Sequence, residues 1–191
     1  MTAPELLEGG VLKVARGLLG WTFLHDGVGG RIVEVEAYAP DEPASHAFRG
    51  RTPRNGSVFG VPGTLYVYRS YGIHWCVNIA CEPEGIGSAV LLRALEPTVG
   101  LEEMRSRRGG VDDRLLCAGP GRLAQALGID GACDGLSVLE PPFALEPRGG
   151  DVEIVASPRI GITKAVELPW RYTVRGSRWA SRPDGRRPAQ P

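Results

Sequence analysis

The segment from Arg31 to Tyr38 constrains the fold most, because its side chains alternate between apolar and polar. Such alternation is typical of a β-strand whose two faces have different surroundings. The apolar face would hold Val33, Val35 and Ala37, and the polar face would hold Glu34, Glu36 and Tyr38. A carboxylate on a covered strand needs a compensating charge, so the polar face is a candidate functional site.

Other segments complete an α+β pattern. Short apolar or alternating runs predict strands at residues 21–24, 64–69, 73–81 and 89–95, with weaker ones at 152–155 and 172–174. Apolar spacing predicts helices at residues 5–19, 97–108 and 121–127. Turns are expected at 27–30 and 71–72, and a long loop at 40–63. These elements predict a single α+β domain with a curved, largely antiparallel β-sheet flanked by helices.

The length of 191 residues suits one domain, placed at residues 1–180, and the polar tail at 181–191 is expected to be disordered. The apolar runs are too short and too interrupted to span a membrane. Residues 1–5 lack the basic and apolar start of a signal peptide, so we expect the protein in the cytoplasm.

The cysteines and histidines do not have the spacing of a metal site. We expect four buried free thiols rather than a disulfide or a zinc site: Cys76, Cys81, Cys117 and Cys133. The sequence accordingly predicts neither a metal nor a cofactor.

The net charge is zero, with 22 basic and 22 acidic residues, which argues weakly against a nucleic-acid partner. The distribution of charge argues the other way, because arginines cluster at residues 49–54, 105–108 and 171–187. Local basic patches can bind phosphate on a protein without net charge. A solvated arginine-rich surface is the alternative, and composition alone favours it.

Several strands carry polar residues where a structural sheet would carry apolar ones: Glu36, Tyr38, Tyr68, Asn78 and Arg93. If neighbouring strands pair, these residues line one concave face. Arg93 near Glu36 would keep the carboxylate ionised, which suits a general base. A structural ion pair is the alternative, and the pattern alone favours it.

Aromatic residues lie near the same face. Tyr38, Tyr68 and Tyr71 are three of the five tyrosines, and aromatic walls bind flat heterocycles by stacking. His46, in the long loop, could hydrogen-bond the edge of such a ring. Half-buried strand tyrosines and an exposed loop histidine are the alternatives.

Ordered motifs resemble the alkyladenine (3-methyladenine) DNA glycosylase family across roughly residues 12–180. They are Gly-Arg-Ile-Val-Glu-Val-Glu-Ala-Tyr at 30–38, Ser-His at 45–46, Thr-Pro-Arg-Asn at 52–55, Pro-Gly-Thr-Leu-Tyr-Val-Tyr at 62–68, Tyr-Gly at 71–72, Val-Leu-Leu-Arg-Ala-Leu-Glu-Pro at 90–97 and Gly-Pro at 119–120. The resemblance implies a base-excision repair enzyme. It would flip 3-methyladenine, 7-methylguanine, hypoxanthine or ethenoadenine out of double-stranded DNA and leave an abasic site.

The resemblance also implies residue roles. Glu36 would activate the attacking water, with Arg93 as its partner. The pocket for the flipped base would hold Tyr38, His46, Tyr68, Cys76 and Asn78, and Asn78 would exclude the amino group of guanine. Tyr71, beside Ile73, would fill the gap left in the duplex. Contacts with the DNA backbone are implied for Thr52, Arg54 and Arg122.

Two positions depart from the family pattern. Ile73 stands where the family has methionine, and Gly121 follows the Gly-Pro motif, where it could loosen the phosphate contact of Arg122. Lys13 and Lys164 are the only lysines and lie outside the polar set, whereas an AP-lyase needs an amine nucleophile. We therefore predict hydrolysis only, by a monomer.

Two other functions fit some of these residues. A non-catalytic binder of damaged DNA is disfavoured because both Glu36 and Arg93 are present. A nucleoside hydrolase would use the same carboxylate chemistry, but Tyr71 at a turn and the arginine clusters favour a polymer substrate. An excision assay tests the first alternative, and comparing duplex with free nucleoside tests the second.

Overall fold

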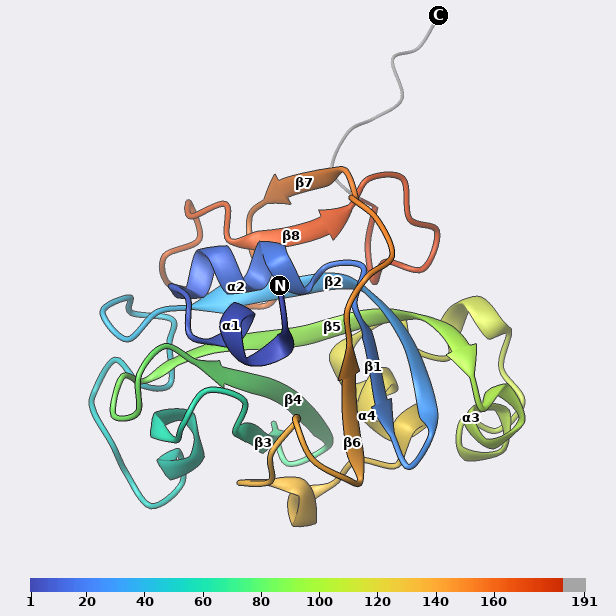
Figure 1. Cartoon of the computed structure of the whole chain (residues 1–191), viewed down its shortest axis with the longest axis horizontal. Helices are drawn as coiled ribbons and strands as arrows, with labels where there is room; N and C mark the ends of the chain where they lie inside the picture. Colours follow the sequence, from blue (N-terminus) through green and yellow to red (C-terminus); the bar gives the residue numbers. More distant parts are fainter. Residues whose placement is uncertain (184–191) are drawn as a thin grey trace, which may run out of the picture.

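A curled antiparallel sheet forms the centre of the molecule, and helices pack against it (Figure 1). The computed structural model describes residues 1–183. Its strands are β1 (Thr22–His25), β2 (Val28–Tyr38), β3 (Leu65–Ser70), β4 (His74–Cys81), β5 (Ser88–Val99), β6 (Phe143–Glu146), β7 (Ile154–Ser157) and β8 (Arg171–Val174). Its helices are α1 (Ala3–Leu7), α2 (Val11–Leu18), α3 (Leu101–Arg107) and α4 (Pro120–Leu127), with short 3₁₀ helices η1 (Gly56–Phe59), η2 (Asp113–Leu115) and η3 (Gly131–Cys133).

The sheet has the order β3-β4-β5-β2-β1-β6, and β8 pairs with both β2 and β7. The strand pairs of the described residues are antiparallel. The predicted α+β fold is therefore confirmed. Strand β6 was not predicted, and β2 is the strand on which β5, β1 and β8 converge.

Two helices occupy the N-terminal segment where we predicted one helix at residues 5–19. Gly9 and Gly10 separate them, and glycine propagates a helix poorly. Thr2 and Glu5 form a capping box that begins α1. The apolar spacing therefore identified the buried face correctly, but the glycine pair interrupts the helix.

Strand β5 is longer than predicted, so the helix expected at residues 97–108 is wrong in its first residues. Val99 still pairs with β2, and Gly100, with φ of 71°, turns the chain before α3 begins. Gly30, which we placed in a turn, lies inside β2. A Cβ there would be 1.9 Å from a carbonyl oxygen of β5, so only glycine permits this close pairing.

The main hydrophobic core lies against one face of β2. Val35 and Ala37 contribute to it as predicted, together with apolar residues of α2 and α4. Val33 does not: it is buried outside this core and Ile32 contributes instead, because the register with β5 shifts between Ile32 and Glu34. Glu34 and Glu36 alternate with these residues and are both 0% exposed. Two fully buried carboxylates on one strand require partners, and these partners define the candidate site.

Several expectations concern the chain as a whole. The four cysteines are free and buried, as predicted. Residues 1–183 contain no group of three His, Cys, Asp or Glu side chains placed to hold a metal ion, and none of their helices is long and apolar enough to cross a membrane. Most of the tail predicted to be disordered, residues 184–191, lies outside the described residues.

Candidate active site

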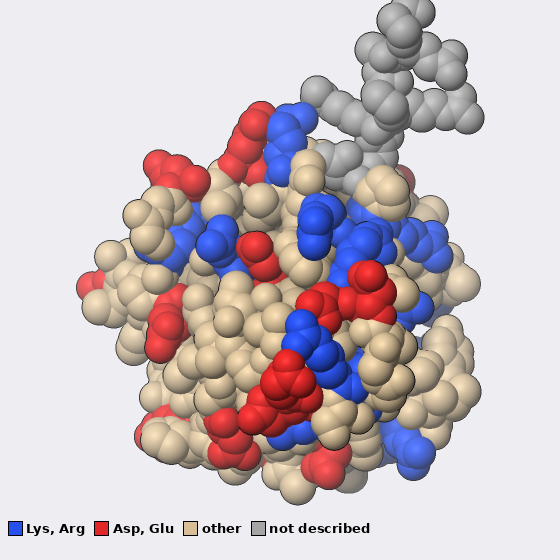
Figure 2. Space-filling model, turned by 90° about the vertical axis from the view of Figure 1, so that its right-hand side faces the viewer, with Lys and Arg blue, Asp and Glu red and all other residues tan. Residues whose placement is uncertain are grey.

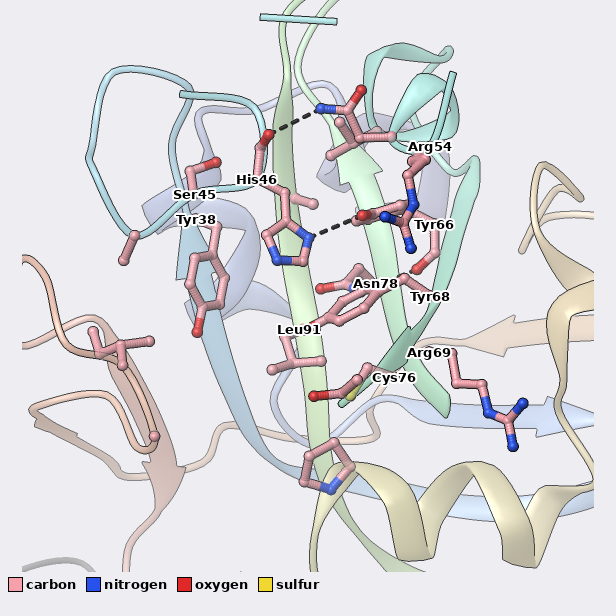
Figure 3. Close-up of a pocket in the computed structure, with 18 of the residues that line it drawn as sticks. Tyr38, Ser45, His46, Arg54, Tyr66, Tyr68, Arg69, Cys76, Asn78 and Leu91 are labelled. Atoms are coloured by element: carbon pink, nitrogen blue, oxygen red, sulfur yellow. Dashed lines mark hydrogen bonds between the residues drawn. The ribbon is translucent and has the colours of Figure 1, made fainter. Parts of the chain in front are cut away.

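Strand pairing brings the predicted polar residues onto one face of the sheet. Tyr66 pairs with Asn78, Asn78 with Leu91, and Leu91 with Glu36, so β3, β4, β5 and β2 all contribute. Residues paired in this way project from the same face. Above them lies a cleft of about 1120 Å³, shown in Figure 3. The predicted site residues that line it are Tyr38, His46, Thr52, Arg54, Tyr68, Tyr71, Cys76, Asn78 and Arg93.

Glu36 lies directly behind the wall of this cleft. The Tyr38 hydroxyl donates a hydrogen bond to its Oε2 over 2.9 Å, and Arg93 Nη1 is 3.2 Å from the same oxygen. The backbone N–H of Ile160 donates to Oε1 over 2.7 Å. All three partners line the cleft. The carboxylate is therefore fixed in one orientation, one layer of side chains from the cleft.

A β-bulge places Arg93 between two carboxylates. The residues that flank Arg93 in β5 pair with consecutive residues of β2, Val35 and Glu34, so Arg93 is the extra residue of the bulge. Its Nε is 3.0 Å from Glu34 Oε1, while its Nη1 approaches Glu36. Burial opposes the charge of Arg93, but Glu36 and Glu34 together raise its pKa above the ordinary value. Arg93 is thus a buried cation shared by both acids.

Glu34 has further partners that the sequence analysis missed. Arg171 Nε is 2.7 Å from its Oε1, and Ser181 donates its backbone N–H to Oε2 over 2.5 Å and its hydroxyl to Oε1 over 2.8 Å. Burial alone would raise the pKa of Glu34, but Arg93, Arg171 and these hydrogen bonds hold it below the ordinary value. Ser181, the first residue of the predicted tail, is thereby tied to the sheet.

An aromatic wall forms one side of the cleft (Figure 3). His46 Nδ1 is hydrogen-bonded to the Tyr66 hydroxyl at 2.9 Å, and the His46 ring meets Tyr68 edge-on with centroids 4.5 Å apart. Tyr66 and Tyr68 stack at 5.3 Å. Burial raises the pKa of Tyr66 to about 12 and that of Tyr68 above its ordinary value, so both hydroxyls stay protonated. Burial lowers the pKa of His46, which favours the neutral imidazole.

Tyr66 was missed as a site residue, although its two-residue spacing from Tyr68 is the signal that places both on one face. Asn78 and Cys76 line the cleft as expected. The Asn78 amide donates to the Tyr66 carbonyl over 3.0 Å, which fixes its orientation. Burial raises the pKa of the Cys76 thiol, so it is a neutral part of the lining.

Asn55 holds the loop that carries His46. Its amide donates to the carbonyls of His46 and Gly50 over 2.9 and 3.1 Å, and its Oδ1 accepts from the backbone N–H and hydroxyl of Thr52 over 2.6 and 2.9 Å. The Thr52 hydroxyl, which we expected near the DNA backbone, thus binds Asn55 in this structure. Arg54 is exposed at the cleft and free to face a ligand.

Tyr71 and Ile73 project from the hairpin that joins β3 to β4. Tyr71 is 90% exposed and Ile73 66% exposed. Tyr71 and Gly72 both have positive φ, of 50° and 69°, and the N–H of Ile73 donates to the Ser70 carbonyl over 3.0 Å. A turn with two left-handed central residues matches the twist of a hairpin. It presents two large apolar side chains to solvent at the edge of the cleft.

One expectation needs correction. Lys164, predicted to lie away from the site, lines the cleft, because the segment between β7 and β8 returns to it. Gly121, which departs from the family pattern, packs closely against β4, because a Cβ at that position would be 2.8 Å from the His74 side chain. Arg122 is exposed on α4 outside the cleft lining, where its Nη1 donates to the Ala118 carbonyl.

The arginine clusters divide into paired and unpaired groups. On the face that carries α3, acidic and basic side chains lie next to one another (Figure 2). Arg105 there binds Glu102 and Asp113, and Arg171 is buried on Glu34. Apart from the buried and paired Arg93, the basic residues that line the cleft are exposed: Arg49, Arg54, Arg69 and Lys164. Basic charge available to an anionic polymer is therefore present around the cleft.

An aromatic cleft can stack on a flat ring, and a buried glutamate held by an arginine can act as a base. Residues 5–178 match the methylpurine-DNA glycosylase family. The chain is 61% identical over 173 residues to a protein of Rhodopseudomonas palustris strain BisB18, covering 91% of this chain and 86% of the relative. It is 57% identical over 184 residues to one of Nitrosospira multiformis, covering 96% and 95%. Both relatives are named as 3-methyladenine DNA glycosylases. The chain therefore belongs to the methylpurine-DNA glycosylase family and is a DNA glycosylase.

Proposed function

We propose that this enzyme removes alkylated and deaminated purines from double-stranded DNA by hydrolysis, with Glu36 activating the attacking water. The observation that carries the proposal is the position of Glu36, held by Tyr38, Arg93 and Ile160 directly behind an aromatic cleft. The names of the relatives, 3-methyladenine DNA glycosylases, support alkylated adenine as one substrate.

Glu36 is fully buried, and the partners that hold it line the cleft, so we expect a purine to leave the duplex and enter the cleft to react there. Tyr38, Tyr68 and His46 supply ring faces and edges for the extruded base. Asn78 would crowd the exocyclic amine that guanine carries and hypoxanthine lacks. Tyr71, exposed at the hairpin, would fill the gap left in the base stack.

The chemistry follows from one carboxylate and one arginine. The water oxygen bonds to C1′ as the bond from C1′ to the base nitrogen breaks, and the bonding electrons leave with the base. Glu36 accepts the proton of the water, and its charge opposes the positive charge that develops on the sugar. A ring-alkylated purine is already cationic and leaves as a neutral base without an acid. A neutral lesion needs a proton on the base as well.

We expect hydrolysis without strand cleavage, by a monomer that uses no metal. Strand cleavage by a lyase would require an amine that attacks C1′. Lys164 is the lysine at the cleft, so it is the residue to test. With borohydride present, neither the wild type nor Lys164→Ala should form a covalent adduct with DNA. An adduct with the wild type that is absent from Lys164→Ala would overturn hydrolysis as the only reaction.

The test is single-turnover excision on duplexes that each carry one lesion: 3-methyladenine, 7-methylguanine, hypoxanthine or ethenoadenine. The expected product is an intact strand with an abasic site, formed equally well in EDTA. Glu36→Gln should bind the lesion duplex but excise about 10²–10⁴-fold more slowly. Glu153→Gln, at an exposed glutamate paired with Arg175, is the matched control and should leave the rate unchanged. Near wild-type excision by Glu36→Gln would refute the mechanism.

A further inference from the structure

A second buried ion pair lies behind the cleft, formed by Arg159 and Glu42. Nη1 of Arg159 is 2.5 Å from Oε1 of Glu42, and Nη2 is 2.9 Å from Oε2. The two side chains are 0% and 4% exposed. Neither residue lines the cleft, and neither was singled out from the sequence. Two parallel hydrogen bonds between a guanidinium and a carboxylate fix both the distance between the two groups and the plane that they share.

The Arg159 guanidinium also supports Tyr38. It lies over the Tyr38 ring at 4.6 Å from the centroid and over the Trp170 ring at 5.4 Å. Its Nη1 donates to the carbonyl of Ala37 over 2.9 Å. Because Tyr38 lines the cleft and Arg159 is buried, the guanidinium covers the side of the ring that faces away from a ligand.

The same ion pair joins two loops that serve the site. Glu42 belongs to the loop 40–63, which carries His46, and its Oε2 also accepts from the backbone N–H of Ala44. Arg159 directly precedes Ile160, whose N–H holds Oε1 of Glu36. One contact therefore couples the position of the His46 loop, the Tyr38 ring and the donor to Glu36.

We infer that Arg159, paired with Glu42, is a positioning residue that fixes Tyr38 and the Ile160 N–H against Glu36. Stability alone does not explain the pair, because apolar residues of similar size often replace buried ion pairs without loss of stability. The Nε of Arg159 also has no hydrogen-bond partner among the described residues, which is a cost of this arrangement. Its planar fork, stacked on two rings, gives geometry that an apolar pair cannot.

The inference rests on the proposed function, and the test uses variants that keep the fold. Arg159→Met combined with Glu42→Met fills the buried site with apolar side chains of similar length. Arg159→Lys keeps the charge but loses the fork and the stacking. The surface pair Arg175 and Glu153, 35% and 69% exposed, is the control when both residues are changed to Met. Each protein is measured for melting temperature, affinity for undamaged duplex and single-turnover excision of 3-methyladenine.

The double variant should melt near the wild-type temperature and bind undamaged duplex normally, because Arg159 is buried and cannot reach DNA. Its excision rate should fall roughly 10- to 100-fold, the scale of a displaced reacting group. Arg159→Lys should also excise more slowly than the wild type, because a lysine keeps the charge but not the two-pronged hydrogen bonding and the stacking. A folded double variant that excises at the wild-type rate would overturn the positioning role. If the wild type itself does not excise 3-methyladenine, the proposed function fails. The affinity of Glu36→Gln for lesion duplex then tests lesion binding, the other part of that proposed function, separately from catalysis.

Discussion

The hydroxyl of Tyr38 donates a 2.9 Å hydrogen bond to Oε2 of Glu36, two residues earlier in the same strand. Alternation along β2 places both side chains on one face, so the strand itself sets their separation. One ring therefore serves both as a wall of the cleft and as a donor to the carboxylate. Burial and the nearby carboxylate raise the pKa of Tyr38 above its ordinary value, so the donor keeps its proton.

Tyr38→Phe separates these two roles, because it removes the hydroxyl and keeps the ring. A hydrogen bond to a charged group contributes about 1.5–3 kcal/mol, so we expect excision to slow roughly 10- to 100-fold. Affinity for lesion duplex should change little. Single-turnover rates and binding measured on the same preparation check this, and Tyr38→Ala, which removes the ring as well, should lose affinity too. A Phe variant with the wild-type rate would show that the hydroxyl does not orient Glu36.

The Glu34 network makes stability depend on pH. The pKa of Glu34 is lower in the folded state than in the unfolded state. Its contribution to the free energy of unfolding is therefore fully present above the ordinary glutamate pKa of about 4.3, and it is lost as the pH falls through the folded pKa. Glu34→Gln should lower the free energy of unfolding at pH 7 by about 3–5 kcal/mol, because Arg93 and Arg171 lose their shared anion.

Urea unfolding of both proteins at several pH values measures this difference. The gap between the wild type and Glu34→Gln should narrow as the pH is lowered below about 4.3. Glu153→Gln, at an exposed ion pair, should show a small effect at every pH. A gap that stays constant down to strongly acidic pH would mean that the charge of Glu34 does not stabilise the fold.

Glu36 and Tyr38 also show how much of the site could be predicted from the sequence. Alternation placed Glu36 and Tyr38 correctly, because a strand repeats every two residues and the pattern is local. The position of Arg93 depends on a bulge in β5, and no pattern of side chains in the sequence predicts this bulge. Arg171 and Ser181 lie 137 and 147 residues from Glu34, and Arg159 lies 117 residues from Glu42, so only folding brings them together. The helix expected from residue 97 failed similarly, because pairing with β2 overrides local propensity.

Asn78 provides a test of substrate choice. Its amide is held by the Tyr66 carbonyl and lines the cleft, so it cannot easily turn away from a base. Asn78→Ala should admit guanine and raise its excision opposite cytosine about tenfold or more, while hypoxanthine excision changes less. Hypoxanthine is the matched control, because it lacks only the exocyclic amine of guanine. Unchanged discrimination between the two bases would remove Asn78 from this role.

Tyr71 provides a test of how the duplex is opened. With 90% of its surface exposed on a hairpin of two left-handed residues, it contributes little to the core. A ring inserted where the base was would restore stacking, and such stacking is worth about 1–3 kcal/mol per base. Tyr71→Ala should therefore weaken lesion-duplex binding and slow excision, without lowering the melting temperature. The loss should be smaller on lesions at mismatched sites, where unstacking is already easier.

The control for Tyr71→Ala is Val61→Ala, which shortens another exposed apolar side chain outside the cleft lining. It should change neither binding nor excision. Ile73→Ala should weaken binding less than Tyr71→Ala, since Ile73 is aliphatic and cannot stack on a base. Melting temperature, binding and single-turnover excision are measured for all three variants. A Tyr71→Ala protein that is destabilised but fully active would contradict the insertion of Tyr71 into the base stack. Loss of a ring that packs against the protein lowers its stability, whereas loss of a ring that enters DNA impairs base flipping.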